Sequence, residues 1–168
     1  MLPACCTVPA CGRCRSKRWT RASPRRSGNG VNGRLIGIDI NVLVRWLTAD
    51  EEITYKRAER LVAEAGDDGL YLGDTVLVEL VWVLTRTYRF GRETALATLE
   101  TLLDMREFVC ADRGLCLEAL CLAQANGCDF ADALVAVRNR EAGCVTTVTF
   151  DQKAARLPFM TLVEEFRS

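Results

Sequence analysis

The stretch that decides the fold is Leu35-Ile-Gly-Ile-Asp-Ile-Asn-Val-Leu-Val44. Its first part, Leu35 to Ile40, is a short apolar run that predicts a buried strand. The residues that follow, Val42 to Leu47, predict a short helix. A strand that passes directly into a helix is typical of α/β proteins with a parallel sheet. The stretch therefore places Asp39 at the carboxyl end of a first strand.

Beyond this stretch, short β-prone segments alternate with longer helical patterns. Strands are expected over residues 70–72, 108–110 and 144–149, and helices over 51–65, 76–89, 93–105, 113–126 and 131–140. Asp74 and Asp112 stand where they would cap two of these helices, and Gly127 would end the helix before it. The alternation predicts a three-layer α/β domain with a mainly parallel sheet over residues 34–168.

Residues 1–33 differ from everything that follows them. They are rich in Arg, Cys, Pro, Ser and Gly, lack periodicity and do not have the order of features found in a secretory signal. We expect a disordered basic tail, or an artefact of gene-start assignment with translation beginning near Val31. N-terminal sequencing or the intact mass of the native protein would test the second idea. A zinc knuckle of Cys5, Cys6, Cys11 and Cys14 is disfavoured, because no second spaced pair of cysteines follows.

The composition of the 168 residues is that of one globular domain, with 49% hydrophobic and 26% charged residues. The formal net charge is zero, with 22 basic and 22 acidic residues, but seven of the basic ones lie in residues 1–33, where there is no acid. Residues 34–168 therefore carry 15 cations against 22 acids. This balance argues against a protein that binds nucleic acid through a basic groove alone, and leaves open one that uses bound metal.

Two further features narrow the chemistry and the compartment. The chain contains no histidine, which excludes Ser-His-Asp and Cys-His catalysis and histidine-containing zinc sites. Its nine cysteines form no regular framework, and no apolar run is long enough to span a membrane. We therefore expect a soluble, cytoplasmic protein whose chemistry depends on carboxylates, hydroxyls, thiols, Lys or Arg.

Four carboxylates lie in or at the end of apolar runs: Asp39, Glu79, Asp132 and Asp151. An ionised carboxylate among core residues is costly unless a cation, a donor or a proton compensates it. We expect these side chains to converge at the carboxyl edge of the sheet around a shared Mg²⁺ or Mn²⁺, since hard divalent cations prefer oxygen ligands.

Each carboxylate also has a simpler explanation. Asp39 could cap the helix that follows it, Glu79 could reach the surface or pair with an arginine of its own helix, and Asp132 could favour a helix N-terminus. Asp151 could be a turn residue, and Asp129 is interpreted as the cap of its helix rather than as a fifth member of the site. The joint occurrence of the four residues favours the cation site.

These motifs resemble those of a known family. Ile38-Asp-Ile-Asn-Val-Leu-Val-Arg45, the isolated Glu79, Asp129-Phe-Ala-Asp-Ala-Leu-Val-Ala136 and Val145-Thr-Thr-Val-Thr-Phe-Asp151 are similar to motifs of the PIN-domain ribonucleases. The resemblance is greatest to the VapC-type toxins of toxin–antitoxin pairs, and it covers residues 35 to about 163 in the expected order. It implies a five-stranded parallel sheet, an acidic Mg²⁺ or Mn²⁺ site and endonucleolytic cleavage of RNA.

The resemblance also implies roles for individual residues. Asp39, Glu79 and Asp132 match the core acids of the family, and Asp151 matches a more variable fourth one. Asn41 would orient Asp39 or a metal-bound water. Thr147 and Thr149 lie where the family often has a hydroxyl near the site, although ordinary strand propensity also explains them.

Partners follow from the same resemblance. Such toxins form homodimers and bind a small antitoxin, often with an arginine that reaches the acidic groove. The segments around Trp46 and Trp82 are candidate contact surfaces, although ordinary core packing is the favoured interpretation for each.

Three other functions share some of these sequence features. A haloacid-dehalogenase-like phosphatase needs a second Asp two residues after the first, and here that residue is Asn41. A catalytically silent PIN-like binding module is disfavoured by the complete set of four acids. A DNA-directed nuclease of the same fold stays open, and cleavage of RNA and DNA with and without EDTA separates the three.

Overall fold

The structure is a computed structural model that describes residues 35–65 and 69–166. The predictions for the tail, namely disorder or a start near Val31, and the disfavoured zinc knuckle, concern residues outside this range. The described chain divides into two compact units, with the boundary between Leu117 and Glu118. We call residues 35–117 the N-terminal unit and residues 118–166 the C-terminal unit, and each is described by itself.

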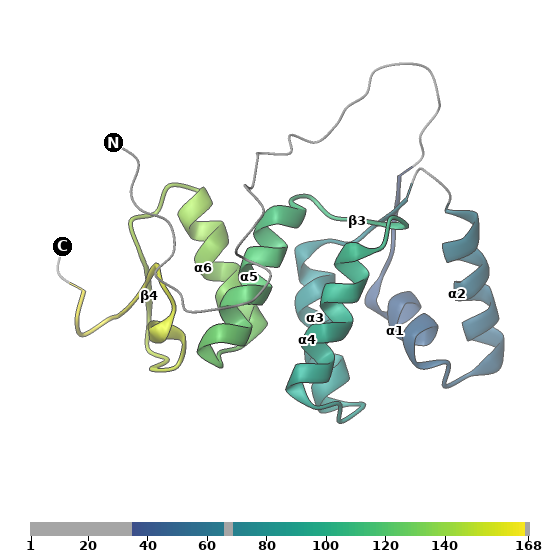
Figure 1. The fold of residues 1–168 in the computed structure, drawn as a ribbon, viewed down its shortest axis with the longest axis horizontal. Coiled ribbons are helices and arrows are strands. Elements are labelled where there is room, and N and C mark those ends of the chain that lie inside the picture. The colour runs from purple at the N-terminus through teal and green to yellow at the C-terminus, as the bar shows by residue number, and fades with distance from the viewer. Residues whose placement is uncertain (1–34, 66–68, 167–168) are drawn as a thin grey trace, which may run out of the picture. The chain divides into compact units, whose positions relative to one another are not determined.

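The N-terminal unit contains a parallel sheet and its connecting helices (Figure 1). Its strands are β1 (Ile36–Gly37), β2 (Leu70–Tyr71) and β3 (Phe108–Val109), in that order across the sheet. Helices α1 (Ile40–Thr48) and α2 (Glu52–Glu64) connect β1 to β2, and α3 (Asp74–Arg86) and α4 (Arg92–Asp104) connect β2 to β3. Both strand pairs are parallel, with Ile36 opposite Leu70 and Leu70 opposite Phe108.

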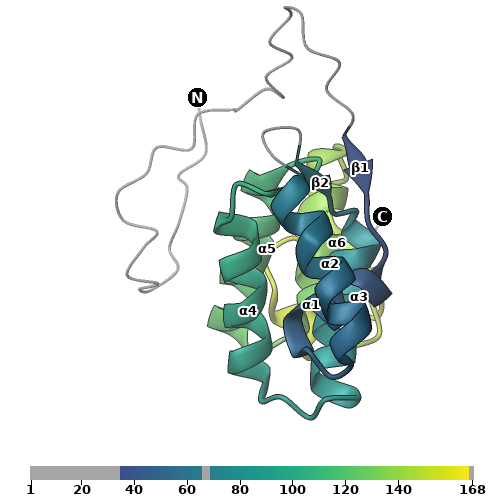
Figure 2. The same cartoon turned by 90° about the vertical axis from the view of Figure 1, so that its right-hand side faces the viewer.

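Apolar stripes at helical spacing hold these helices together. In α3 the fully buried side chains are Leu77, Leu80 and Leu84, which recur every three or four residues and so lie on one side of the helix. Burial of each such leucine stabilises the fold by roughly 1.5–3 kcal/mol. α1 lies against α2 and α3, and α3 lies against α4, as Figure 2 shows from the side.

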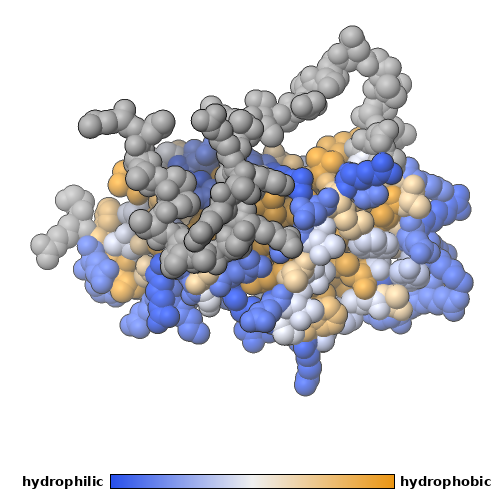
Figure 3. All heavy atoms as spheres, viewed as in Figure 1, coloured by the Kyte–Doolittle hydropathy of each residue, from blue (hydrophilic) through white to orange (hydrophobic). Residues whose placement is uncertain are grey.

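The surface of α2 is polar, in keeping with its position at the edge of the N-terminal unit. Figure 3 shows hydrophilic side chains gathered over this helix. They include two ion pairs one helical turn apart, Glu52 with Lys56 at 2.5 Å and Arg60 with Glu64 at 2.6 Å. Exposed pairs of this kind contribute only a few tenths of a kcal/mol, about 0.3–0.5 each. None of the helices in residues 35–65 and 69–166 has both the length and the apolarity needed to cross a membrane.

The C-terminal unit contains most of α5 (Arg113–Asn126), followed by α6 (Phe130–Glu141), β4 (Thr147–Thr149), the 3-10 helix η1 (Ala154–Arg156) and β5 (Met160–Leu162). β4 and β5 pair in parallel, and α6 lies against β4. Arg140 of α6 donates two hydrogen bonds to Glu118 of α5, and its guanidinium lies 4.8 Å from the centre of the Phe159 ring. These contacts fix α6, which carries Asp132, within the unit.

The structure confirms an α/β fold with parallel strands. It contains five strands, which form one sheet of three and another of two rather than a single sheet. The first and fourth strands are shorter than expected, at 36–37 and 147–149. The first ends early because Asp39 caps α1, which already begins at Ile40. β5 and η1 were not predicted.

Of the two helix N-caps predicted at Asp112 and Asp74, the first is confirmed and the second is wrong. Asp112 lies just before α5, and its Oδ1 accepts a hydrogen bond of 3.0 Å from the backbone N–H of Leu115. Asp74 is not a cap but the first residue of α3, where Gly73 takes the N-cap position. A carboxylate in the first turn still interacts favourably with the helix dipole, which explains why the two positions are hard to separate by sequence.

Candidate active site

The four predicted site carboxylates are divided equally between the two units. Asp39 and Glu79 belong to the N-terminal unit, and Asp132 and Asp151 belong to the C-terminal unit. Each pair therefore has a defined geometry only within its own unit.

The expectation that apolar flanks bury these carboxylates is wrong. Asp39, Glu79 and Asp151 are exposed, Asp132 is half-buried, and no charged side chain is buried among the residues that the structure describes. The helical rotation of about 100° per residue explains the result for Glu79. Leu77 and Leu80 on either side of it in sequence are fully buried, while Glu79 faces outward. Burial cost alone therefore does not require a cation.

Asp39 is held in place by its own helix. Its backbone is extended, at φ −87° and ψ 158°, and its Oδ2 accepts hydrogen bonds from the Asn41 backbone N–H at 3.4 Å and from Asn41 Nδ2 at 2.9 Å. The side-chain hydrogen bond from Asn41, followed by backbone hydrogen bonds from Asn41 and Ile40, lowers the pKa of Asp39 below its ordinary value. Asp39 is therefore a fixed, ionised carboxylate two residues after β1.

Glu79 lies on the exposed side of α3, in its second turn. Its side chain forms no ion pair or hydrogen bond with any other residue that the structure describes, so it does not pair with an arginine of its own helix. Glu79 is thus an ionisable oxygen donor whose position depends only on the rigid helix that carries it.

Asp132, in the C-terminal unit, has a pKa above the ordinary value of an aspartate. It lies in the first turn of α6, where its partial burial raises its pKa, and the negative charges of Asp129 and Asp151 raise it further. Neither Asp129 nor Asp132 forms an ion pair with another described residue. Three carboxylates therefore interact here without a compensating cation from the described chain.

The interpretation of Asp129 as a helix cap is confirmed only in its position. Asp129 precedes α6 with an extended backbone, but its side chain makes no capping hydrogen bond. Its exposed carboxylate instead adds negative charge next to Asp132. The sequence analysis did not assign this contribution to Asp129. Asp129 and Asp132 are three residues apart, and this spacing could have suggested it, because side chains three apart are neighbours on a helix.

Asp151 closes the turn between β4 and η1. Its Oδ1 accepts hydrogen bonds from the backbone N–H groups of Lys153 at 2.6 Å and Ala154 at 3.4 Å. The Thr149 hydroxyl accepts a hydrogen bond of 3.0 Å from the backbone N–H of Asp151, so it supports the same turn. The Thr147 hydroxyl accepts from Asn139 Nδ2 at 2.9 Å and ties β4 to α6. Asp151 is therefore positioned firmly, two residues after the end of β4.

The chemistry of these donors fits a hard divalent cation. All are carboxylate oxygens, and a cation would relieve the repulsion that raises the pKa of Asp132. No three Asp, Glu, Cys or His side chains of the described residues are grouped closely enough to hold a metal.

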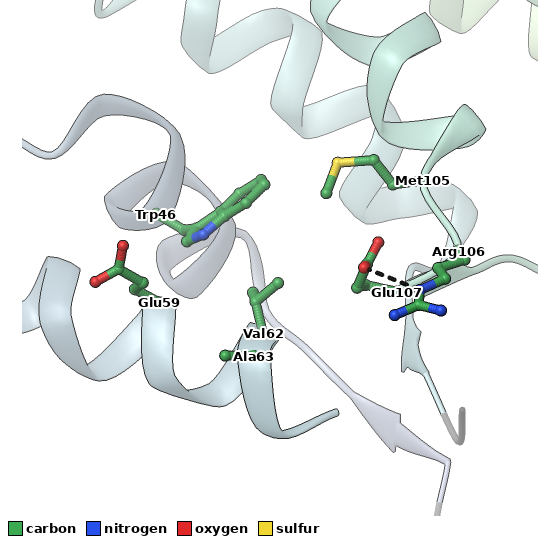
Figure 4. A pocket seen from close by; sticks show the side chains of 7 residues that line it. All are labelled: Trp46, Glu59, Val62, Ala63, Met105, Arg106 and Glu107. Carbon is green, nitrogen blue, oxygen red and sulfur yellow. Dashed lines mark hydrogen bonds and ion pairs between the residues drawn. The ribbon is translucent and has the colours of Figure 1, made fainter. Parts of the chain in front are cut away.

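A separate pocket of about 220 Å³ lies in the N-terminal unit (Figure 4). Its lining residues are Trp46, Glu59, Val62, Ala63, Met105, Arg106 and Glu107. Trp46 also contacts Phe108 edge to face, with ring centres 5.5 Å apart. None of the four site carboxylates lines this pocket.

The two candidate contact surfaces differ in exposure. Trp46 is half-buried, whereas Trp82 is 59% exposed. Core packing, the alternative considered for both, is therefore wrong for Trp82, because the buried side of α3 is taken by its leucines.

Comparison with known proteins supports the reading of the motifs. The family model described as "PIN domain" matches residues 36–160. The chain is also 28% identical over 127 residues to the VapC ribonuclease of Aquifex aeolicus (strain VF5), a match that covers 74% of this chain and 93% of that protein. Because the domain match spans β1 to the start of β5, this chain belongs to the PIN-domain family.

Proposed function

We propose that this protein is a Mg²⁺- or Mn²⁺-dependent endoribonuclease and the toxin component of a toxin–antitoxin pair. The observation that carries the proposal is membership of the PIN-domain family, whose model matches residues 36–160. The distant similarity to a VapC ribonuclease supports the same activity, and the negative charges of Asp129 and Asp151 near the half-buried Asp132 fit a cation site.

The proposal assigns the four carboxylates to one site, and the structure describes them in two units. Asp39 follows the end of β1 by two residues, and Asp151 follows the end of β4 by two residues. The carboxyl ends of parallel strands are where α/β proteins bind their ligands.

These four residues would hold the cation, directly or through water molecules. When bound, a divalent cation supplies charge neutralisation at the phosphate and lowers the pKa of water. Asp39 contributes a carboxylate that Asn41 keeps ionised and oriented. Asp132 contributes the proton-responsive carboxylate, which releases its proton more readily once positive charge is near.

The reaction would be hydrolysis of an RNA phosphodiester bond. The oxygen of water forms a bond to phosphorus in line with the departing O3′, the P–O3′ bond breaks, and the leaving O3′ takes up a proton. Glu79 and Asp151 serve as positioning carboxylates, the first on a rigid helix and the second in a hydrogen-bonded turn.

Cleavage of a structured RNA and of DNA, with and without EDTA, tests the activity. We expect cleavage of RNA that EDTA abolishes and excess Mg²⁺ or Mn²⁺ restores. Asp39→Asn should abolish cleavage and relieve growth arrest on expression, with an unchanged circular dichroism spectrum. Asp104→Asn is a matched control, because Asp104 pairs with Arg113 and is not one of the four site residues. Full activity of Asp39→Asn, or activity that EDTA does not reduce, would contradict the mechanism.

The same experiments separate the alternatives. A catalytically silent binding module would cleave neither RNA nor DNA under any metal condition, and a DNA-directed nuclease of the same fold would cleave DNA in preference to RNA. The phosphatase alternative predicts release of inorganic phosphate from monoesters, which the proposed function does not.

The proposed partners are a second copy of this chain and a small antitoxin protein. An arginine of the antitoxin that enters the carboxylate cluster would replace the cation as the positive partner, through charge-assisted hydrogen bonds. Copurification with the product of a neighbouring small gene, and recovery of nuclease activity after its removal, would support this part of the proposal.

A further inference from the structure

One side of α3 is exposed along its whole length and carries a defined set of side chains. Thr75, Glu79, Trp82 and Arg86 are all exposed, and their spacings of four, three and four residues place them on one stripe of the helix. The opposite side contains the buried leucines. We call these four residues the α3 stripe.

Trp82 is unusual among the residues of this stripe. It is 59% exposed and is the one large exposed apolar side chain of α3, a helix that the structure describes completely. Its neighbours along the stripe are charged, with Glu79 one turn before it and Arg86 one turn after it. Surfaces that bind single-stranded nucleic acid combine aromatic rings that stack on bases with cations that contact phosphates, and Trp82 and Arg86 supply one group of each kind.

Arg86 is available for a phosphate in a way that Arg45 is not. Arg45 donates a hydrogen bond of 2.6 Å to Asp50, which also accepts one from the Tyr88 hydroxyl. Arg86 forms no hydrogen bond or ion pair with another residue in the described part of the chain. Its guanidinium can therefore donate to phosphate oxygens without breaking an existing pair.

The order of groups along the stripe matches the parts of a nucleotide chain. The helical rise places Trp82 about 4.5 Å along the axis from Glu79, and Arg86 about 6 Å beyond Trp82. A carboxylate of the proposed cation site, a stacking ring and a phosphate-binding cation thus follow one another on a rigid helix.

We propose that the α3 stripe binds single-stranded RNA next to the cleavage site. Trp82 stacks on an unpaired base close to the scissile phosphate, and Arg86 contacts a neighbouring phosphate. This inference rests on the proposed function, because Glu79 is one of the carboxylates assigned there.

The first test measures binding without cleavage. A short single-stranded RNA oligonucleotide with a fluorescent label is titrated with the full chain in EDTA, and fluorescence anisotropy is read. Trp82→Ala should weaken binding about 5- to 150-fold, the range expected for loss of one stacked base. Trp82→Phe should retain most of the affinity. Ile53→Ala is the matched control, because Ile53 is an equally exposed apolar residue of α2, at 63%, and should change nothing.

Arg86→Ala should reduce the salt dependence of binding. Loss of one phosphate contact to a single strand lowers the slope of log affinity against log salt by about 0.7. An unchanged slope would overturn the phosphate role of Arg86.

The second test asks whether Trp82 contacts a base. The oligonucleotide is made with an abasic nucleotide at successive positions, and each is bound to the wild type and to Trp82→Ala. We expect one position at which the abasic change weakens the wild type but not Trp82→Ala. Equal losses for both proteins at every position would overturn the stacking role. Sedimentation could instead show that Trp82→Ala loses self-association while no abasic position affects the two proteins differently. In that case the stripe is an interface between copies and the inference fails.

Failure of this inference can be told apart from failure of the proposed function. Binding in EDTA needs no catalysis, so loss of binding in Trp82→Ala supports the stripe even if no cleavage is ever found. Conversely, Trp82→Ala could show metal-dependent cleavage with the same KM as the wild type. The proposed nuclease activity would then stand, and RNA binding by the α3 stripe would be contradicted. If both ideas are right, Trp82→Ala raises KM more than it lowers kcat.

Discussion

Asp132 links pH, divalent cations and stability in a way that one substitution can test. Burial and the charges of Asp129 and Asp151 raise its pKa in the folded state. Between the ordinary pKa of an aspartate and this raised value, the folded state binds more protons than the unfolded state. The free energy of unfolding therefore falls as pH rises through this window, and the loss persists at higher pH. Asp132→Asn removes the charge with little change of shape, so in EDTA at pH 7 the variant should be more stable than the wild type.

A bound cation reverses the sign of this effect. A metal that binds only the folded state at 100 times its dissociation constant adds about 2.7 kcal/mol. For a chain of this size that corresponds to a rise in melting temperature on the order of 8–10 °C. The wild type should show this rise with Mn²⁺ or Mg²⁺, and Asp132→Asn should show much less of it.

Thermal unfolding followed by circular dichroism, from pH 4 to pH 8 and with EDTA or Mn²⁺, measures both effects. Asp104→Asn is the control, since Asp104 is paired with Arg113 and lies outside the cluster. It should cost at most about 1 kcal/mol and leave the response to Mn²⁺ unchanged. If Asp132→Asn is less stable than the wild type in EDTA at pH 7, or responds fully to Mn²⁺, the assignment of Asp132 to a cation site is refuted.

Three other substitutions separate chemistry from stability. Glu79→Gln should lower kcat about 100-fold or more if Glu79 helps to hold the cation. The melting temperature should stay within the small range of surface substitutions, because the Glu79 side chain has no partner among the described residues. Equal activity of the variant and the wild type in a cleavage assay would remove Glu79 from the site. Asp151→Ala should cost about 1 kcal/mol in urea unfolding through the lost turn hydrogen bonds to Lys153 and Ala154, and Asp151→Asn should recover much of that stability but not the cleavage. Leu80→Ala should cost about 2–5 kcal/mol in the same experiment, because Leu80 is fully buried; a loss below 1 kcal/mol would contradict the packing of α3.

Local patterns predicted the order of the elements well. Helices α2, α4 and α5 begin and end within two residues of the predicted bounds, because their apolar spacing is encoded locally in the sequence. β5, by contrast, was missed. Its residues 160–162 become a strand by pairing with β4, an interaction that no local pattern contains.

The burial of the site could not be predicted in the same way. The apolar surround of Glu79 suggested a buried charge, yet it contains the same residues that an amphipathic helix needs. Only the packing of Leu77, Leu80 and Leu84 decides which side faces inward, and it leaves Glu79 and Trp82 outside. The exposure of Trp82 was missed for the same reason. A helical-period count over residues 74–86 could have found it, since Trp82 is three residues from Glu79 and shares its side.

Asp39 and Asp132 have opposite pKa shifts, and each shift arises from neighbours within its own unit. Asn41 lowers the pKa of Asp39 within one unit, so this carboxylate is ionised whether or not a cation is present. Burial and like charges raise the pKa of Asp132 within the other, and nearby positive charge would lower that pKa again. As pH falls, Asp132 therefore takes up a proton before Asp39 does. Metal binding should therefore release protons and weaken as pH falls, because protons and the cation compete for Asp132 rather than for Asp39.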